Sequence, residues 1–338
     1  MKLAVGYPVS DAADVIEAFV AAVEHHRDGI EEVYFAMPGD ASGRSPSRGG
    51  ALQREALTHL HSLGVRLDLL FNANCYGPEA AGAALADHVC RRMQDAAALG
   101  KVSVVTTASP FVAQVVRRRF PWVELRASVN MRIGTVAAMQ MAGDLFDGFY
   151  VQRDYNRDLD RVRHLRRWCS ANGKRLCGLV NSGCLAYCPG QTFHDNLVAH
   201  EADADAPLEA DLLPCRRHLR DRANWTSILS ATWIRPSDLH HYDSLFDIAK
   251  LATRMHAHPE RVIRAYATGT FRGNLLDLLE PGYDQVAREV WLAQTVFPDD
   301  WFQRTTSCGR ECDDCGYCAS VLARAMAKRS PRESASTA

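Results

Sequence analysis

The chain has 338 residues, 47% of them hydrophobic, and a formal net charge of −1. It can therefore bury the core of one large domain or two smaller ones, and its balanced charge gives no bulk attraction to nucleic acid or to an anionic membrane. No apolar run approaches the roughly 20 residues that span a bilayer, and the N-terminus lacks the pattern of a signal peptide. We therefore expect a cytoplasmic protein with no membrane contact, whose thiols stay reduced.

Strand-like and helix-like segments alternate along the chain. The predicted strands are Lys2–Pro8, Glu31–Pro38, Arg66–Cys75, Lys101–Ala108, Glu124–Asn130, Asp147–Asp154, Arg175–Asn181 and Thr226–Pro236. The predicted helices between them are Asp11–His26, Leu52–Leu63, Pro78–Leu99, Pro110–Phe120, Gly134–Met141 and Leu159–Asn172. This alternation indicates parallel strands joined by right-handed crossovers. A closed (β/α)8 barrel of the TIM type accounts for it. An open doubly wound α/β sheet is the alternative, but no GxGxxG follows the first strand.

The chain after the seventh strand departs from this rhythm. The stretch Gln191–Asn224 is too long for a plain βα connection, and we expect it to fold back over the mouth of the barrel. The barrel is predicted to cover residues 1–241, including a cysteine loop and insert at 182–224. A helical extension follows at 242–329, with helices at Tyr242–His256 and Pro259–Thr268, and residues 330–338 are predicted to be a disordered tail.

Three cysteines follow the seventh predicted strand. Cys184 and Cys188 stand in VNSGCLAYCP, and Cys215 comes later in the insert. Three soft thiolate ligands suit an iron–sulfur cluster or zinc. The fourth ligand could be Cys75, at the end of the third strand, or Cys177, within the seventh. Cys177 is expected to point into the barrel core, which favours Cys75; in a further alternative, one iron has no cysteine ligand and is open to substrate.

A second cysteine group lies in the extension. The segment SCGRECDDCGYC contains four cysteines in eleven residues, Cys308, Cys312, Cys315 and Cys318. The residues between them are polar or small, so a thiol cluster here has little apolar surface around which to fold. We predict a second four-thiolate site that holds a 4Fe–4S cluster, with structural zinc as the alternative.

Catalytic side chains of such barrels come from the C-terminal ends of the strands. Polar residues at these ends give four catalytic candidates: Asn130, Arg153, Asn181 and Arg235. No GxSxG, HExxH or P-loop motif is present.

Together these segments resemble the peptidase U-32 family, the collagenase-like proteins. The resemblance is carried by NSGCLAYCP with Cys215 downstream, and by the IRPSDL and TGTFRGNLLDLLEP segments. It implies a (β/α)8 barrel with a 4Fe–4S cluster, and an oxidoreductase that performs oxygen-independent hydroxylation or another redox modification of a small molecule or RNA. An external electron donor and a related partner chain are then expected. The family title keeps a collagenase-like protease as an alternative, and a non-catalytic metal-binding subunit is a third. The four-cysteine segment has no counterpart in the shared core.

Overall fold

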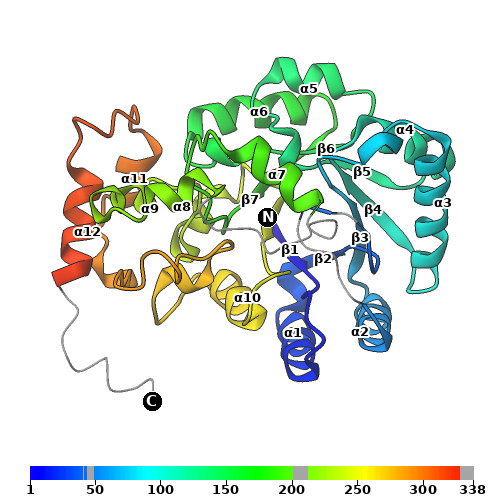
Figure 1. Ribbon diagram of the computed structural model, residues 1–338, viewed down its shortest axis with the longest axis horizontal. Coiled ribbons are helices and arrows are strands. Elements are labelled where there is room, and N and C mark those ends of the chain that lie inside the picture. Colours follow the sequence, from blue (N-terminus) through cyan, green and yellow to red (C-terminus); the bar gives the residue numbers. More distant parts are fainter. Residues whose placement is uncertain (41, 44–48, 201–211, 328–338) are drawn as a thin grey trace.

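Eight parallel strands close into a barrel in chain order. The computed structural model describes residues 1–40, 42–43, 49–200 and 212–327. The strands are β1 (Lys2–Gly6), β2 (Ile30–Phe35), β3 (Arg66–Phe71), β4 (Val102–Thr107), β5 (Glu124–Ala127), β6 (Gly148–Tyr150), β7 (Arg175–Leu179) and β8 (Ile248–Leu251). Since β1 pairs in parallel with both β2 and β8, the predicted (β/α)8 fold is confirmed and the open sheet is excluded (Figure 1).

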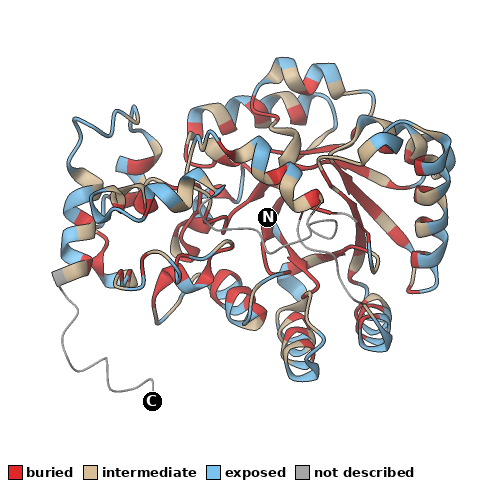
Figure 2. Ribbon diagram, in the orientation of Figure 1, coloured by how far each residue is buried: buried red, intermediate tan, exposed pale blue. Residues whose placement is uncertain are grey.

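Amphipathic helices surround the barrel and bury one face each against it. They are α1 (Ala13–His25), α2 (Ala51–Ser62), α3 (Ala83–Ala97), α4 (Pro110–Arg119), α5 (Val136–Ala142), α6 (Leu159–Ala171) and α10 (Pro259–Thr268). In α1, for example, the spacing of Ile16, Phe19 and Val23 places all three side chains in the core. Helix α4 begins with a favourable cap, because Ser109 Oγ accepts a hydrogen bond from the Val112 amide (3.2 Å). Figure 2 shows buried strands inside a ring of helices with exposed outer faces.

The predicted eighth strand was wrong. Residues 226–229 form the short helix α9 (Thr226–Leu229), and the true β8 lies in a segment that was predicted to be helical. The apolar residues that suggested a strand, Ile228 and Trp233, are buried in the core but not in the sheet. The barrel therefore continues beyond residue 241, and α10 completes its ring by packing against α1. This corrects the predicted boundary between barrel and extension.

The end of the insert and the extension form a lobe beside β7. Its helices are α8 (Pro214–His218), α9, α11 (Trp301–Thr306) and α12 (Tyr317–Ala327), and α12 packs against α9. Helix α7 (Gln191–Ala199) lies over the barrel instead (Figure 1), and its Asp195 pairs with Arg132, which follows β5 (3.5 Å). Figure 1 shows α11 and α12 beyond α8 and α9, on the side of the molecule opposite α3. Short 3₁₀ helices, Pro236–Tyr242, Leu275–Leu278 and Gln294–Val296, connect the lobe to the barrel.

None of the helices in the described part of the chain is long and apolar enough to cross a membrane. The predicted disordered tail at 330–338 lies outside the described residues.

The core has two parts. The larger cluster fills the space between sheet and helices, and a second, smaller one lies inside the barrel around Tyr34, Tyr150 and Cys177. The barrel interior also contains charged side chains, which belong to four different strands: Glu32, Asp68, Arg126 and Lys250. It is thus an unusually polar version of the packed interior typical of this fold.

Candidate active site

A chain of hydrogen bonds crosses the mouth of the barrel where β3, β5 and β6 end. Asn130 lies in a 3₁₀ turn after β5, and its Nδ2 donates to the Asn72 carbonyl after β3 (3.2 Å). Arg153 begins the turn after β6, and its Nη2 donates to Asn130 Oδ1 (3.1 Å). The other guanidinium nitrogen, Nη1, donates to the Cys184 sulfur (3.1 Å). Three predicted site residues, Asn130, Arg153 and Cys184, are therefore in direct contact.

The loop that carries Cys184 is fixed on both sides. Thr232 donates from its amide to the Cys184 carbonyl (3.2 Å) and from its hydroxyl to the Ser182 carbonyl (3.0 Å). On the other side, a Cβ on Gly183 would lie 2.0 Å from the Pro281 carbonyl oxygen. Only glycine allows this close approach. The cysteine loop is thereby clamped between the chain after α9 and the segment that ends at Pro281.

Cys188 and Cys215 meet although 26 residues separate them in the chain. The two thiols are hydrogen-bonded, which lowers the pKa of Cys188 to about 6 and raises that of Cys215. The negative charge of Cys184 also raises the pKa of Cys215, so all three sulfurs share one electrostatic environment. A Cβ on Gly190 would lie 2.6 Å from the Pro214 ring, which shows how closely the returning insert packs on the loop. The end of the insert therefore returns to the cysteine loop, while residues 201–211 of the stretch expected to fold over the mouth lie outside the described residues.

The two candidates for a fourth ligand lie in different surroundings. Cys75 follows β3, and hydrogen bonds from the His200 side chain and the Gly77 amide lower its pKa. Cys177 is fully buried inside the barrel, where burial raises its pKa to about 12. Cys177 thus points into the core, as expected, and Cys75 stays the predicted fourth ligand.

The other two catalytic candidates make structural contacts. Both amide hydrogens of Asn181 are donated to backbone carbonyls, those of Ala252 and Leu278 (both 2.9 Å). The guanidinium of Arg235 forms two hydrogen bonds with Asp238 (2.7 and 2.8 Å) and lies 4.6 Å from the Phe297 ring centre. Because the predicted eighth strand does not exist, Arg235 is not at the end of a strand. The structure does not bring Asn181 or Arg235 into contact with Arg153.

The extension cysteines lie between α11 and α12. Cys308, Cys312 and Cys315 are exposed, and Cys318 is half-buried at the start of α12. In the described residues, no group of three or more His, Cys, Asp or Glu side chains is already arranged to hold a metal ion. Among the described residues, neither predicted ligand set is therefore closed around a common point.

Sequence reasoning missed the charged network inside the barrel. Arg126 forms ion pairs with Glu32 and with Glu124 (2.7 Å for the latter). Thr106 donates to Asp68 (2.8 Å), and Lys250 Nζ lies 3.7 Å from the Tyr34 ring centre. Glu32, Asp68, Arg126 and Lys250 come from four different strands, and only the closed barrel brings them together. An isolated charge inside a buried strand was the available signal.

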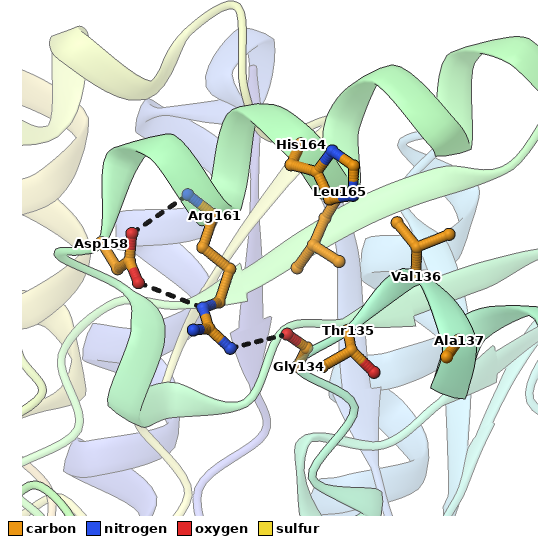
Figure 3. A pocket seen from close by; sticks show the side chains of 8 residues that line it. All are labelled: Gly134, Thr135, Val136, Ala137, Asp158, Arg161, His164 and Leu165. Carbon is orange, nitrogen blue, oxygen red and sulfur yellow. Dashed lines mark hydrogen bonds and ion pairs between the residues drawn. The ribbon is translucent and has the colours of Figure 1, made fainter.

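A separate depression lies at the rim, between the turns that follow β5 and β6. It is lined by residues of α5 and α6 and of the turns before them, and Figure 3 shows the Arg161 side chain extending from α6 towards Gly134. Arg161 donates to Asp158 Oδ2 (3.1 Å) and to the Gly134 carbonyl (3.4 Å). None of the predicted site residues lines this depression.

Comparison with known proteins supports the resemblance described above. No family model matches the chain. It is 29% identical over 176 residues to an uncharacterized protease of Methanocaldococcus jannaschii, a match that covers 51% of each chain. The chain thus aligns with about half the length of that curated relative. In fold it is similar to the solved U32 peptidase Mk0906, with a TM-score of 0.52, 15% identity, and coverage of 74% of this chain and 92% of the other.

Proposed function

Because sequence and fold both support its place among the peptidase U-32 proteins, we propose that this chain is an iron–sulfur enzyme. The proposed reaction is an oxygen-independent hydroxylation, or another redox modification, of a small molecule or RNA. Its site lies at the mouth of the barrel, between the cysteine loop and the polar side chains that end β3, β5 and β6.

One observation carries this proposal: the hydrogen-bonded series that links the mouth of the barrel to the cysteine loop. Arg153 donates to Cys184 and to Asn130, so a single buried cation joins a sulfur to the polar residues at the mouth. The nearby Cys188–Cys215 pair adds two more thiols. Three soft donors fit a 4Fe–4S cluster or zinc by their chemistry, and Cys75 or a ligand from outside the chain would complete the set.

The residues of the chain have separable tasks in this proposal. Cys184, Cys188 and Cys215 would hold the cluster, which supplies one-electron transfer when bound. Arg153 would stabilise negative charge on the Cys184 sulfur, because hydrogen bonds and charge around the ligands tune such a centre. Asn130 and Asn72 offer amide groups to a substrate at the mouth. Asn181 and Arg235 are positioning residues, because their polar atoms hold the backbone or another side chain.

The first test is the metal content of anaerobically reconstituted protein. Iron, acid-labile sulfide, zinc and the visible spectrum should be measured for the wild type and for Cys184→Ser, Cys188→Ser and Cys215→Ser. Each variant should lose most of the cluster at the barrel mouth, since a serine hydroxyl is a poor replacement for a thiolate ligand. Cys90→Ser is the matched control, because Cys90 lies in α3, remote in the chain from either cysteine group. Full iron and sulfide in all three loop variants would contradict the proposed site.

A second candidate function is proteolysis, which the name of the curated relative favours. Robust hydrolysis of gelatin or peptides by the same protein, lost on replacing a residue other than cysteine, would establish it. A third candidate is a non-catalytic metal-binding subunit. Protein that holds zinc and no iron would favour it over the proposed redox enzyme.

A further inference from the structure

The segment between α11 and α12 has almost no means of folding by packing. From Cys308 to Gly316 it contains no regular helix or strand. Its three cysteines are exposed, and Cys318, the fourth of the group, lies in α12 and is half-buried. The residues between the first three cysteines have no large apolar side chain; they are Gly309, Arg310, Glu311, Asp313 and Asp314. Tyr317, which precedes Cys318, opens α12 and stacks on Trp301. A segment of this composition needs another source of order.

The four sulfurs lie close enough to act on one another electrostatically. Burial and, to a lesser extent, the charges of the other three cysteines raise the pKa of Cys318 to about 11, although the charge of Arg157 opposes them. Burial also raises the pKa of Cys312, and the charges of Cys308 and Cys315 add to this effect. The four cysteines therefore form one cluster, in which no more than three residues separate one cysteine from the next along the chain.

The segment also touches the cysteine loop of the barrel. The guanidinium carbon of Arg310 lies 6.0 Å from the ring centre of Tyr187, the residue next to Cys188. Both contacting residues have left-handed backbone conformations, with φ of 63° for Arg310 and 56° for Tyr187. Residues other than glycine rarely adopt this conformation, and it recurs at functional sites. Tyr187 is itself anchored, because its amide donates to Asp154 Oδ1 (2.6 Å).

We propose that Cys308, Cys312, Cys315 and Cys318 hold a second iron–sulfur cluster, placed against the cysteine loop of the barrel by the contact between Arg310 and Tyr187. Closing the site requires the four sulfurs to move together, and the lack of regular structure from 308 to 316 permits this. The free energy of metal binding would then order the segment.

The position of this site assigns it a role in electron entry, which rests on the proposed function. A reduced one-electron carrier, of the flavin or iron–sulfur protein class, would give up one electron at the exposed segment and be oxidised. The same electron would pass to the cluster at Cys184, Cys188 and Cys215, which is reduced. No covalent bond forms or breaks in this step.

The experiment uses the full chain, reconstituted anaerobically, with Cys312→Ser and Cys315→Ser as test variants and Cys90→Ser as control. Both replaced cysteines are exposed, so the variants should fold. We expect each variant to contain about half the iron and sulfide of the wild type, and the control to be unchanged. Reduction of the remaining cluster by reduced methyl viologen, followed by stopped-flow absorbance, should be several-fold slower in the variants.

Other outcomes separate this proposal from the proposed function. Variants that lose zinc and keep all their iron would show a structural zinc site and overturn the proposal. Full iron in both variants would overturn it as well, and an unchanged reduction rate would overturn the role in electron entry. If Cys184→Ser keeps all its iron while Cys312→Ser loses it, the barrel site is wrong and the extension site stands.

Discussion

At the scale of single residues, the least expected feature is Lys250. It lies in β8 with its amine inside the barrel, where burial lowers its pKa to about 8 although the charges of Asp68 and Glu32 oppose this effect. Burial likewise raises the pKa of Asp68 to about 6. The interior therefore holds an acid and a base whose charged forms are both disfavoured by the lack of water.

Several polar atoms in the barrel interior have no hydrogen-bond partner among the described residues: Glu32 Oε2, Asp68 Oδ1, Arg126 Nη2 and the Tyr150 hydroxyl. Internal water is the usual partner for such atoms.

Lys250 gives a prediction about stability and pH. Its pKa of about 8 in the folded protein lies below the ~10.4 of an unfolded chain. Between these values the unfolded state binds more protons, so this residue makes the folded state more stable as pH rises. The free energy of unfolding of wild type relative to Lys250→Met should therefore increase from pH 8 to pH 10, by up to about 3 kcal/mol. Urea denaturation at several pH values measures it. Lys101→Met, at an exposed lysine, should show no such trend. If the difference in unfolding free energy between wild type and Lys250→Met is also independent of pH, the lowered pKa of Lys250 is wrong.

At the scale of elements, the sequence located seven strands to within a few residues and misplaced the eighth. The seven are marked by near-continuous apolar runs such as VSVV in β4, which both faces of a covered sheet require. In β8 the apolar run is only four residues long and includes Lys250. The sequence of this segment alone therefore does not identify it as a strand. The spacing of Cys184, Cys188 and Cys215 and the polar strand ends Asn130 and Arg153 were found because they follow recognisable strands. Arg235 was wrongly predicted to lie at a strand end, because the predicted eighth strand that contains it does not exist.

Asn181 links three elements, and its replacement tests that role. Its side chain accepts from the Ala252 amide (2.6 Å) and donates to the carbonyls of Ala252 and Leu278, at the ends of β8 and of the 3₁₀ helix 275–278. Asn181→Leu would leave these buried groups without partners, at about 1–3 kcal/mol for each unsatisfied group. We expect a loss of about 3 kcal/mol or more in the free energy of unfolding by urea. Asn172→Leu, at the exposed end of α6, should lose less than about 1 kcal/mol. Equal losses in the two variants would refute the linking role.

At the scale of the whole molecule, one arginine joins the extension to the barrel. Arg157 is buried after β6 and donates to the carbonyls of Trp233 (2.9 Å from Nε) and Leu229 (2.6 Å). Its guanidinium also lies 5.2 Å from the ring centre of Trp233 and 5.6 Å from that of Trp301, which begins α11. A cation held between two aromatic rings and two carbonyls connects the barrel, the chain after α9 and the extension at one point. The charge of Arg157 also lowers the pKa of Cys318 against the larger effect of burial. The extension cysteines are thus coupled to the barrel through the same residue.

Arg157→Met should therefore loosen the extension more than the barrel. Methionine fills most of the volume of the arginine side chain but leaves the carbonyls of Leu229 and Trp233 without hydrogen-bond donors. Hydrogen exchange of backbone amides should increase in α11, where Trp301 contacts Arg157, and in α12, which packs on α9. It should change little in the central strands of the barrel, since local opening follows the elements that lose contacts. Arg163→Met is the control, because Arg163 pairs only with the exposed Asp160 among the contacts described. If protection from hydrogen exchange falls equally in β1–β8 and in α12, the substitution has lowered the stability of the whole protein. Arg157 then does not act as the local link between the barrel and its cysteine-bearing extension.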